Sequence, residues 1–68
     1  MLAIERQEQI VSQIRRNGAV RIHELTKQFG VSVETIRRDL LELERQDCLH
    51  RVHGGAVGIA VAKQYHRL

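Results

Sequence analysis

The sequence predicts a mainly α-helical domain that ends in a small β-hairpin. Apolar residues recur at helical spacing in three segments up to about residue 46, and two short β-prone runs then follow on either side of a glycine pair. A length of 68 residues allows one small domain. Because 43% of the residues are apolar, we expect a compact core rather than disorder.

The first helix is expected from about Ala3 to Arg16. Four apolar residues are expected to mark its inner face: Ile4, Ile10, Val11 and Ile14. Gly18 suits the left-handed position that ends a helix. The next three residues, 19–21, form a short extended connection that can serve as one edge strand.

The second helix is expected from about Ile22 to Phe29, and Leu25 is buried together with these two end residues. Its start lacks a good cap, because Arg21 stands where serine or threonine is preferred. Gly30 then provides the sharp turn that leads to the next helix.

The third helix is expected from Val33 to about Gln46. Ser32 is a good N-cap, because its hydroxyl can accept a hydrogen bond from a free N–H group of the first turn. The inner face is expected to hold four apolar residues: Val33, Ile36, Leu40 and Leu43. Asp47 breaks the helix, although aspartate tolerates a left-handed turn less well than glycine.

The hairpin is expected from residues 48–52 and 56–59, with a turn at His53-Gly54-Gly55. Residues 60–68 form a linker or a terminal helix. Three helices followed by a hairpin predict a winged helix-turn-helix. In this arrangement two helices support the third, and the glycine-rich tip of the wing is free to lie along a phosphate backbone.

The third helix is expected to present arginines to duplex DNA. At about 100° per residue, Arg38 points roughly 160° away from Ile36 and is the expected base reader. Arg37 lies on the flank, as a phosphate contact or as the partner of a nearby carboxylate. The alternative is that both are ordinary solvated charges.

Other polar residues at the start of this helix are further candidates for DNA contact. Ser32 and Thr35 can donate to phosphates, and the alternative for Ser32 is capping alone. Glu34 either accepts from a cytosine amino group or, as we favour, simply complements the positive helix end. Asp39 is interpreted as structural, and the arginine that it would hold is either Arg37 or one from the wing.

The wing supplies the remaining candidate contacts: Arg51, His53, Gly54 and Gly55. The absence of side chains at two glycines permits close approach to a sugar-phosphate backbone. An ordinary hairpin turn is the alternative.

Charge and size limit the classes of function. A net charge of +3 and a sequence pI of about 9.8 favour a polyanionic partner. The chain is too small to enclose an ordinary substrate pocket, so we expect no catalytic residues. No segment is apolar enough to span a bilayer, and we expect no membrane partner. A lone Cys48 excludes an internal disulfide and fits a reducing compartment, which indicates the cytoplasm.

A zinc site is the weaker interpretation of the segment that begins at Cys48. His50 and His53 follow closely, but strand alternation puts His53 on the opposite side from the other two. A fourth ligand would have to be His23 or His66. We therefore expect no metal.

The sequence resembles the N-terminal winged helix-turn-helix domain of DeoR-type bacterial transcriptional regulators. The matching residues are Arg6, Ile10 and Ile14, then Ser32, Thr35, Ile36, Arg37, Arg38, Asp39 and Leu40, and finally His53-Gly54-Gly55-Ala56. The resemblance covers residues 3–58, with the helix-turn-helix at about 20–39 and a linker at 59–68. It departs from the family where Asp47 replaces the usual glycine and Cys48 fills an apolar position.

This resemblance implies that the partner is a double-stranded DNA operator and that the regulator represses genes of sugar or nucleoside catabolism. It places Cys48 in the core and His53 on the wing. It further implies a C-terminal domain, not contained in these residues, that binds a phosphorylated sugar and forms homo-oligomers; the present residues would bind no cofactor.

The alternative function is a winged-helix module that contacts only proteins. Its outward helix face should be apolar or acidic, whereas this one carries Thr35, Arg38 and Arg45, with Leu41 as an exception.

Overall fold

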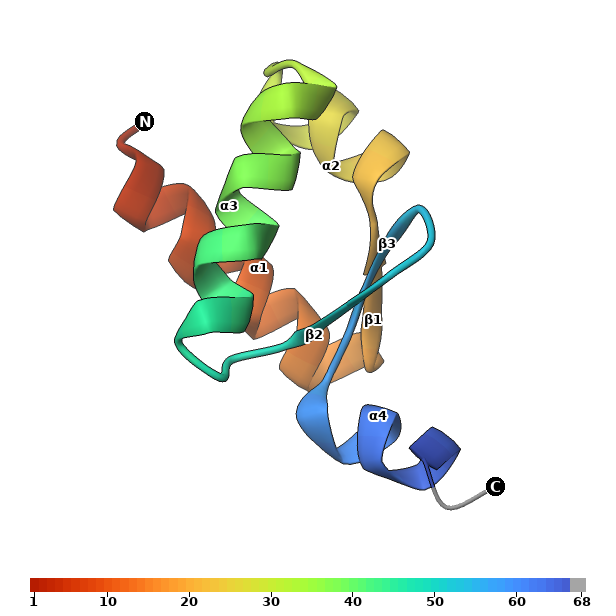
Figure 1. Cartoon of the computed structure of the whole chain (residues 1–68). Coiled ribbons are helices and arrows are strands. Elements are labelled where there is room, and N and C mark those ends of the chain that lie inside the picture. Colours follow the sequence, from red (N-terminus) through yellow and green to blue (C-terminus); the bar gives the residue numbers. More distant parts are fainter. Residues whose placement is uncertain (67–68) are drawn as a thin grey trace.

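The computed structural model describes residues 1–66, with side chains to residue 62. The described elements are α1 (Ala3–Asn17), β1 (Ala19–Arg21), α2 (Ile22–Phe29), α3 (Val33–Arg45), β2 (His50–Val52), β3 (Gly55–Val57) and α4 (Ile59–His66), as Figure 1 shows. The predicted three helices and hairpin are confirmed, and so is the winged helix-turn-helix fold. The end of the hairpin was placed wrongly, because its second strand is Gly55–Val57 and Ile59 begins α4. The region expected as linker or terminal helix is helical up to His66, and residues 67–68 lie outside the described part.

The three strands form one antiparallel sheet in the order β1-β3-β2. Val20 pairs with Ala56 on one side of β3, and Arg51 pairs with Ala56 on the other. The amide of Ile22 also donates to the carbonyl oxygen of Gly54 at 2.9 Å. The hairpin is therefore held against the start of α2 as well as against β1.

Nine buried side chains from all three main helices, the sheet and the loop before β2 form the core: Ile10, Ile14, Val20, Leu25, Ile36, Leu40, Leu43, Leu49 and Ala56. Ile22 and Phe29 pack against this core but remain partly exposed. The core is aliphatic, and it joins the hairpin to the back of α3.

One residue expected on the inner face of α1 was placed wrongly. Ile4 is 63% exposed, whereas Arg6 is buried on the same helix. Arg6 precedes Ile10 by four residues and so lies about 40° from it, while Ile4 is turned about 120° away. The helical period therefore puts a charged residue into the buried stripe of α1.

The third helix buries three of its four expected inner residues. Val33, in the first turn, is 40% exposed, because the core lies below it at Ile36 and Leu40. At the other end, Asp47 adopts a left-handed conformation with φ of 60°. The amide of Cys48 then bonds to the carbonyl oxygen of Leu43 at 2.9 Å. Aspartate thus supplies the turn for which glycine is more usual.

Within the described residues, no helix is both long and apolar enough to cross a membrane.

Candidate nucleic-acid interface

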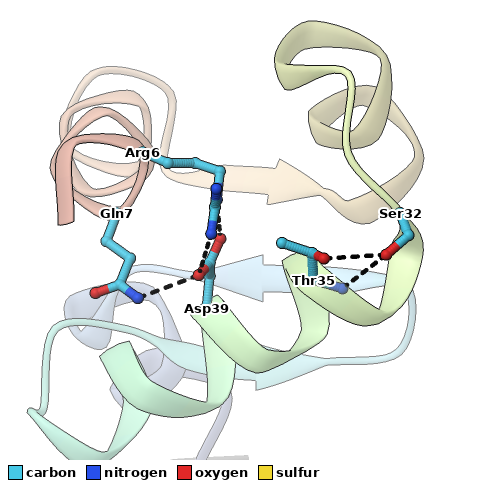
Figure 2. Close-up of polar contacts among 5 residues, drawn as sticks. All are labelled: Arg6, Gln7, Ser32, Thr35 and Asp39. Carbon is cyan, nitrogen blue, oxygen red and sulfur yellow. Dashed lines mark hydrogen bonds and ion pairs between the residues drawn. The ribbon is translucent and has the colours of Figure 1, made fainter. Parts of the chain in front are cut away.

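The turn before α3 sets where this helix begins. Gly30 has a φ of 65°, and its amide bonds to the carbonyl oxygen of Thr26 at 2.8 Å. Ser32 then caps α3: its Oγ accepts from the amide of Thr35 at 3.2 Å and lies 3.0 Å from the Thr35 hydroxyl (Figure 2). The predicted cap is confirmed, and the first turn of α3 is held rigidly at the protein surface.

A buried ion pair holds the middle of α3 against α1. The guanidinium of Arg6 donates to both carboxylate oxygens of Asp39, through Nε to Oδ2 and through Nη2 to Oδ1 (Figure 2). Gln7 adds a hydrogen bond from Nε2 to Oδ1 at 3.1 Å. The hydrogen bond to Asp39 raises the pKa of Arg6, so the guanidinium remains charged although it is buried.

The structural role expected for Asp39 is therefore confirmed, but its expected partners were wrong. It binds Arg6 of α1, not Arg37 or a wing arginine. Arg37 and Asp39 are separated by about 200° around the helix, so they leave it on different sides. Arg6 lies one turn before Ile10 on the buried side of α1. Because a buried charge requires a partner of opposite charge, this position indicated a buried acid.

The outward side of α3 carries most of the candidate DNA contacts. Glu34, Arg37 and Arg38 are exposed, and Thr35 is partly buried by its contact with the cap. The side chains of Arg37 and Arg38 make no hydrogen bond or ion pair with the part of the chain that the structure describes. Both guanidinium groups are therefore available to a ligand.

A cleft of about 490 Å³ separates α3 from the wing. Arg37 lines it from the helix, and Arg51, His53 and Gly54 line it from the hairpin. The hairpin passes to one side of α3, while α1 passes behind the helix (Figure 1). Gly55 also lines the cleft, so all four predicted wing residues come together there with one predicted helix residue, Arg37.

The position expected for Gly55 at the wing tip was wrong. Gly55 is buried in β3, and a Cβ atom added there would lie 2.1 Å from the carbonyl oxygen of Val20. The turn consists of His53 and Gly54, and of the two wing glycines only Gly54 combines a positive φ, of 77°, with open space around the Cβ position. Gly55 allows β1 and β3 to approach closely, so glycine is required here for close strand packing and not for a turn.

Arg51 is held by an acid that the sequence reasoning missed. Glu44 of α3 accepts from the backbone amide of Arg51 through Oε2 at 2.8 Å, and from Arg51 Nε through Oε1 at 2.9 Å. Its Oε2 also lies 3.6 Å from His50 Nδ1. These contacts lower the pKa of Glu44, and the backbone hydrogen bond contributes most. Glu44 follows Arg37 by two helical turns, so the sequence places both on one side of the helix.

The histidines and Cys48 do not form a cluster in the described residues. No group of three potential metal ligands is found there. Cys48 is partly buried and packs against the core, and His53 is exposed on the wing. The side chain of His66, one of the two possible fourth ligands, lies outside the described part.

Comparison with known proteins assigns this chain to a family. Residues 6–61 match the DeoR-like helix-turn-helix domain. The chain is 49% identical over 59 residues to an uncharacterized HTH-type transcriptional regulator, YulB, of Bacillus subtilis, covering 87% of this chain and 23% of that protein. It is 45% identical over 53 residues to a putative aga operon transcriptional repressor of Escherichia coli O157:H7, covering 78% of this chain and 20% of that protein.

Another relative, a lactose phosphotransferase system repressor of Streptococcus mutans, is 46% identical over 52 residues, with 76% of this chain and 21% of the relative covered. The chain thus spans between a fifth and a quarter of the length of these relatives. No solved structure gives a significant match. The chain belongs to the DeoR-like helix-turn-helix domain family, the DNA-binding domains of DeoR-type transcriptional regulators.

Proposed function

We propose that the domain reads a double-stranded DNA operator with α3 while the wing grips the adjacent phosphate backbone. The observation that carries this proposal is the cleft between α3 and the hairpin, which is lined by Arg37 and Arg51. The next residue of α3, Arg38, is exposed. The major groove of DNA admits one α-helix, and positively charged side chains beside that helix can bind the phosphates that flank the groove.

Each exposed residue has a distinct role in this proposal. Arg38, which is exposed and lies about 160° around the helix from the buried Ile36, contacts a base edge, since a guanidinium can bond the O6 and N7 atoms of guanine. Arg37 and Arg51 face the cleft and contact phosphates. Ser32 and Thr35 are engaged with each other, so their contribution is to hold the first turn, whose free N–H groups attract a phosphate.

Glu34 and the wing tip complete the proposed interface. Glu34 lies in the first turn of α3, where its charge favours the positive helix end. His53 and Gly54 form the exposed turn of the hairpin. Because nothing lies within 4 Å of the Cβ position of Gly54, the turn leaves room for a sugar-phosphate backbone.

The biological role follows from the relatives by analogy. One is named for the aga operon and another for the lactose phosphotransferase system. We propose that this domain directs a cytoplasmic, non-enzymatic regulator to genes of sugar or nucleoside use, as a repressor. A phosphorylated sugar would bind a C-terminal domain outside these residues, and that domain would join the subunits into a homo-oligomer.

Selection of bound duplexes from a random pool tests the proposal and identifies the operator. With that duplex, Arg38→Ala should weaken specific binding by about 1–3 kcal/mol and relax the preference at one base pair. Arg16→Ala is the matched control, because it removes the same charge from the exposed end of α1. Fluorescence anisotropy would contradict the assignment if both variants bound the selected and scrambled duplexes as the wild type does.

A further inference from the structure

An acidic side chain of α3 is bonded to Arg51, one of the residues that line the proposed phosphate-binding cleft. Glu44 projects from α3 toward β2, and its side chain is only 28% exposed. An uncompensated carboxylate here would repel DNA. Both of its oxygens are engaged, however, and both bonds come from the same residue, Arg51.

The geometry of these two bonds restricts Arg51 at two points. The bond from the backbone amide fixes β2 relative to α3, and the bond from Nε fixes the base of the guanidinium. No hydrogen bond from either terminal nitrogen of Arg51 is found among the described residues. Those two nitrogens are the ones that form a fork for phosphate oxygens.

We propose that Glu44 is a positioning residue, which holds Arg51 by Nε so that its two terminal nitrogens face a DNA phosphate in the cleft shared with Arg37. This role rests on the proposed DNA binding. Without Glu44, the long arginine side chain recovers its rotamer freedom, and binding a phosphate must order it again.

Simple charge counting predicts the opposite effect of losing Glu44. Removing one negative charge would raise the net charge of the domain and strengthen its attraction to DNA. Salt screens such a long-range effect over about 8 Å at physiological ionic strength. The orienting effect acts through direct hydrogen bonds and is screened much less. The two explanations therefore differ in the sign of the change in affinity.

Glu44→Gln separates the two explanations. Glutamine has the same shape and can still accept from the Arg51 amide, but its NH2 group cannot accept from Nε. Glu42→Gln is the matched control on the same helix. The Glu42 carboxylate contacts Arg45 at 3.9 Å and Gln46 at 3.1 Å, and no contact with Arg51 is found for it in the described part of the chain. At about 0.15 M salt, we expect Glu44→Gln to bind the selected duplex about threefold to tenfold more weakly, the net scale of one ordinary hydrogen bond.

We expect Glu42→Gln to bind equally well or more tightly. The same measurement in an Arg51→Met background identifies the route of the effect. If Glu44 acts through Arg51, Glu44→Gln causes no further loss there, whereas a purely structural role would weaken binding in both backgrounds.

Tighter binding by Glu44→Gln, or an equal loss in both backgrounds, would overturn the positioning role while leaving the proposed DNA binding intact. A wild-type chain that selects no duplex would overturn the proposed function itself, and this inference with it.

Discussion

Removing the charge of Asp39 should cost this domain a large share of its stability. Asp39 is 3% exposed and Arg6 is 9% exposed, and three side-chain hydrogen bonds converge on the carboxylate. Breaking one partner of such a buried pair leaves the other charge uncompensated, which typically costs about 3–5 kcal/mol. We expect Asp39→Asn to fall near the lower value, because the amide oxygen can still accept one hydrogen bond.

The size of the domain makes this loss easy to measure. At about 0.05–0.15 kcal/mol per residue, 68 residues give a total stability of roughly 3–10 kcal/mol. A loss of about 3 kcal/mol lowers the Tm of so small a domain by roughly 12–24 °C. Thermal and urea unfolding, followed by circular dichroism at 222 nm, measures both quantities.

Two further variants test the physical reasoning. Replacing both partners, as Arg6→Met with Asp39→Leu, should restore most of the lost stability, because no charge is left buried. Glu8→Gln on the exposed side of α1 should change the stability by less than about 0.5 kcal/mol. A Tm of Asp39→Asn within 2–3 °C of the wild type, a shift of about half a kcal/mol or less, would refute the argument.

Three other outcomes are expected. Ser32→Ala should cost about 0.5–2 kcal/mol in urea unfolding through loss of the cap, and Ser32→Asp should restore it. Gly55→Ala should lower the stability more than Gly54→Ala, because it places a Cβ 2.1 Å from the carbonyl oxygen of Val20. Gly54→Ala costs only the roughly 1–2 kcal/mol of a left-handed alanine. Equal Tm values for the two variants would contradict this. Because the pKa of Glu44 is lowered from 4.5 on folding, its contribution to stability is present above pH 4.5 and is lost as the pH falls through the lowered value. In acid titration, the stability of Glu44→Gln should therefore fall less steeply with pH than that of the wild type.

The helices were predictable because their signals are local. The bounds Ile22–Phe29 of α2 follow from one apolar stripe and the glycine that ends it, and Ser32 identifies the start of α3. The error at Ile4 arose from counting apolar residues without following the helical angle, which favours Arg6. In this case the sequence was sufficient, because the period of about 3.6 residues per helical turn places Arg6 on the buried side of α1.

The partners of charged residues were not predictable in the same way. Arg6 and Asp39 are 33 residues apart, and their meeting depends on how α1 crosses α3. The contact between Glu44 and Arg51 depends on how β2 leaves the end of α3. Gly55 could not be assigned to the strand from its residue type, because turns and close strand contacts both require glycine. These features are set by tertiary packing.

The hydrogen bond from the amide of Ile22 to the carbonyl oxygen of Gly54 ties the wing tip to the start of α2. In the proposed DNA complex, this bond limits how far the wing can move relative to the helix-turn-helix. A site whose groove width matched this spacing would bind with little ordering cost to the protein. A mismatched site would have to deform, so the shape of the DNA would contribute to selection alongside its bases.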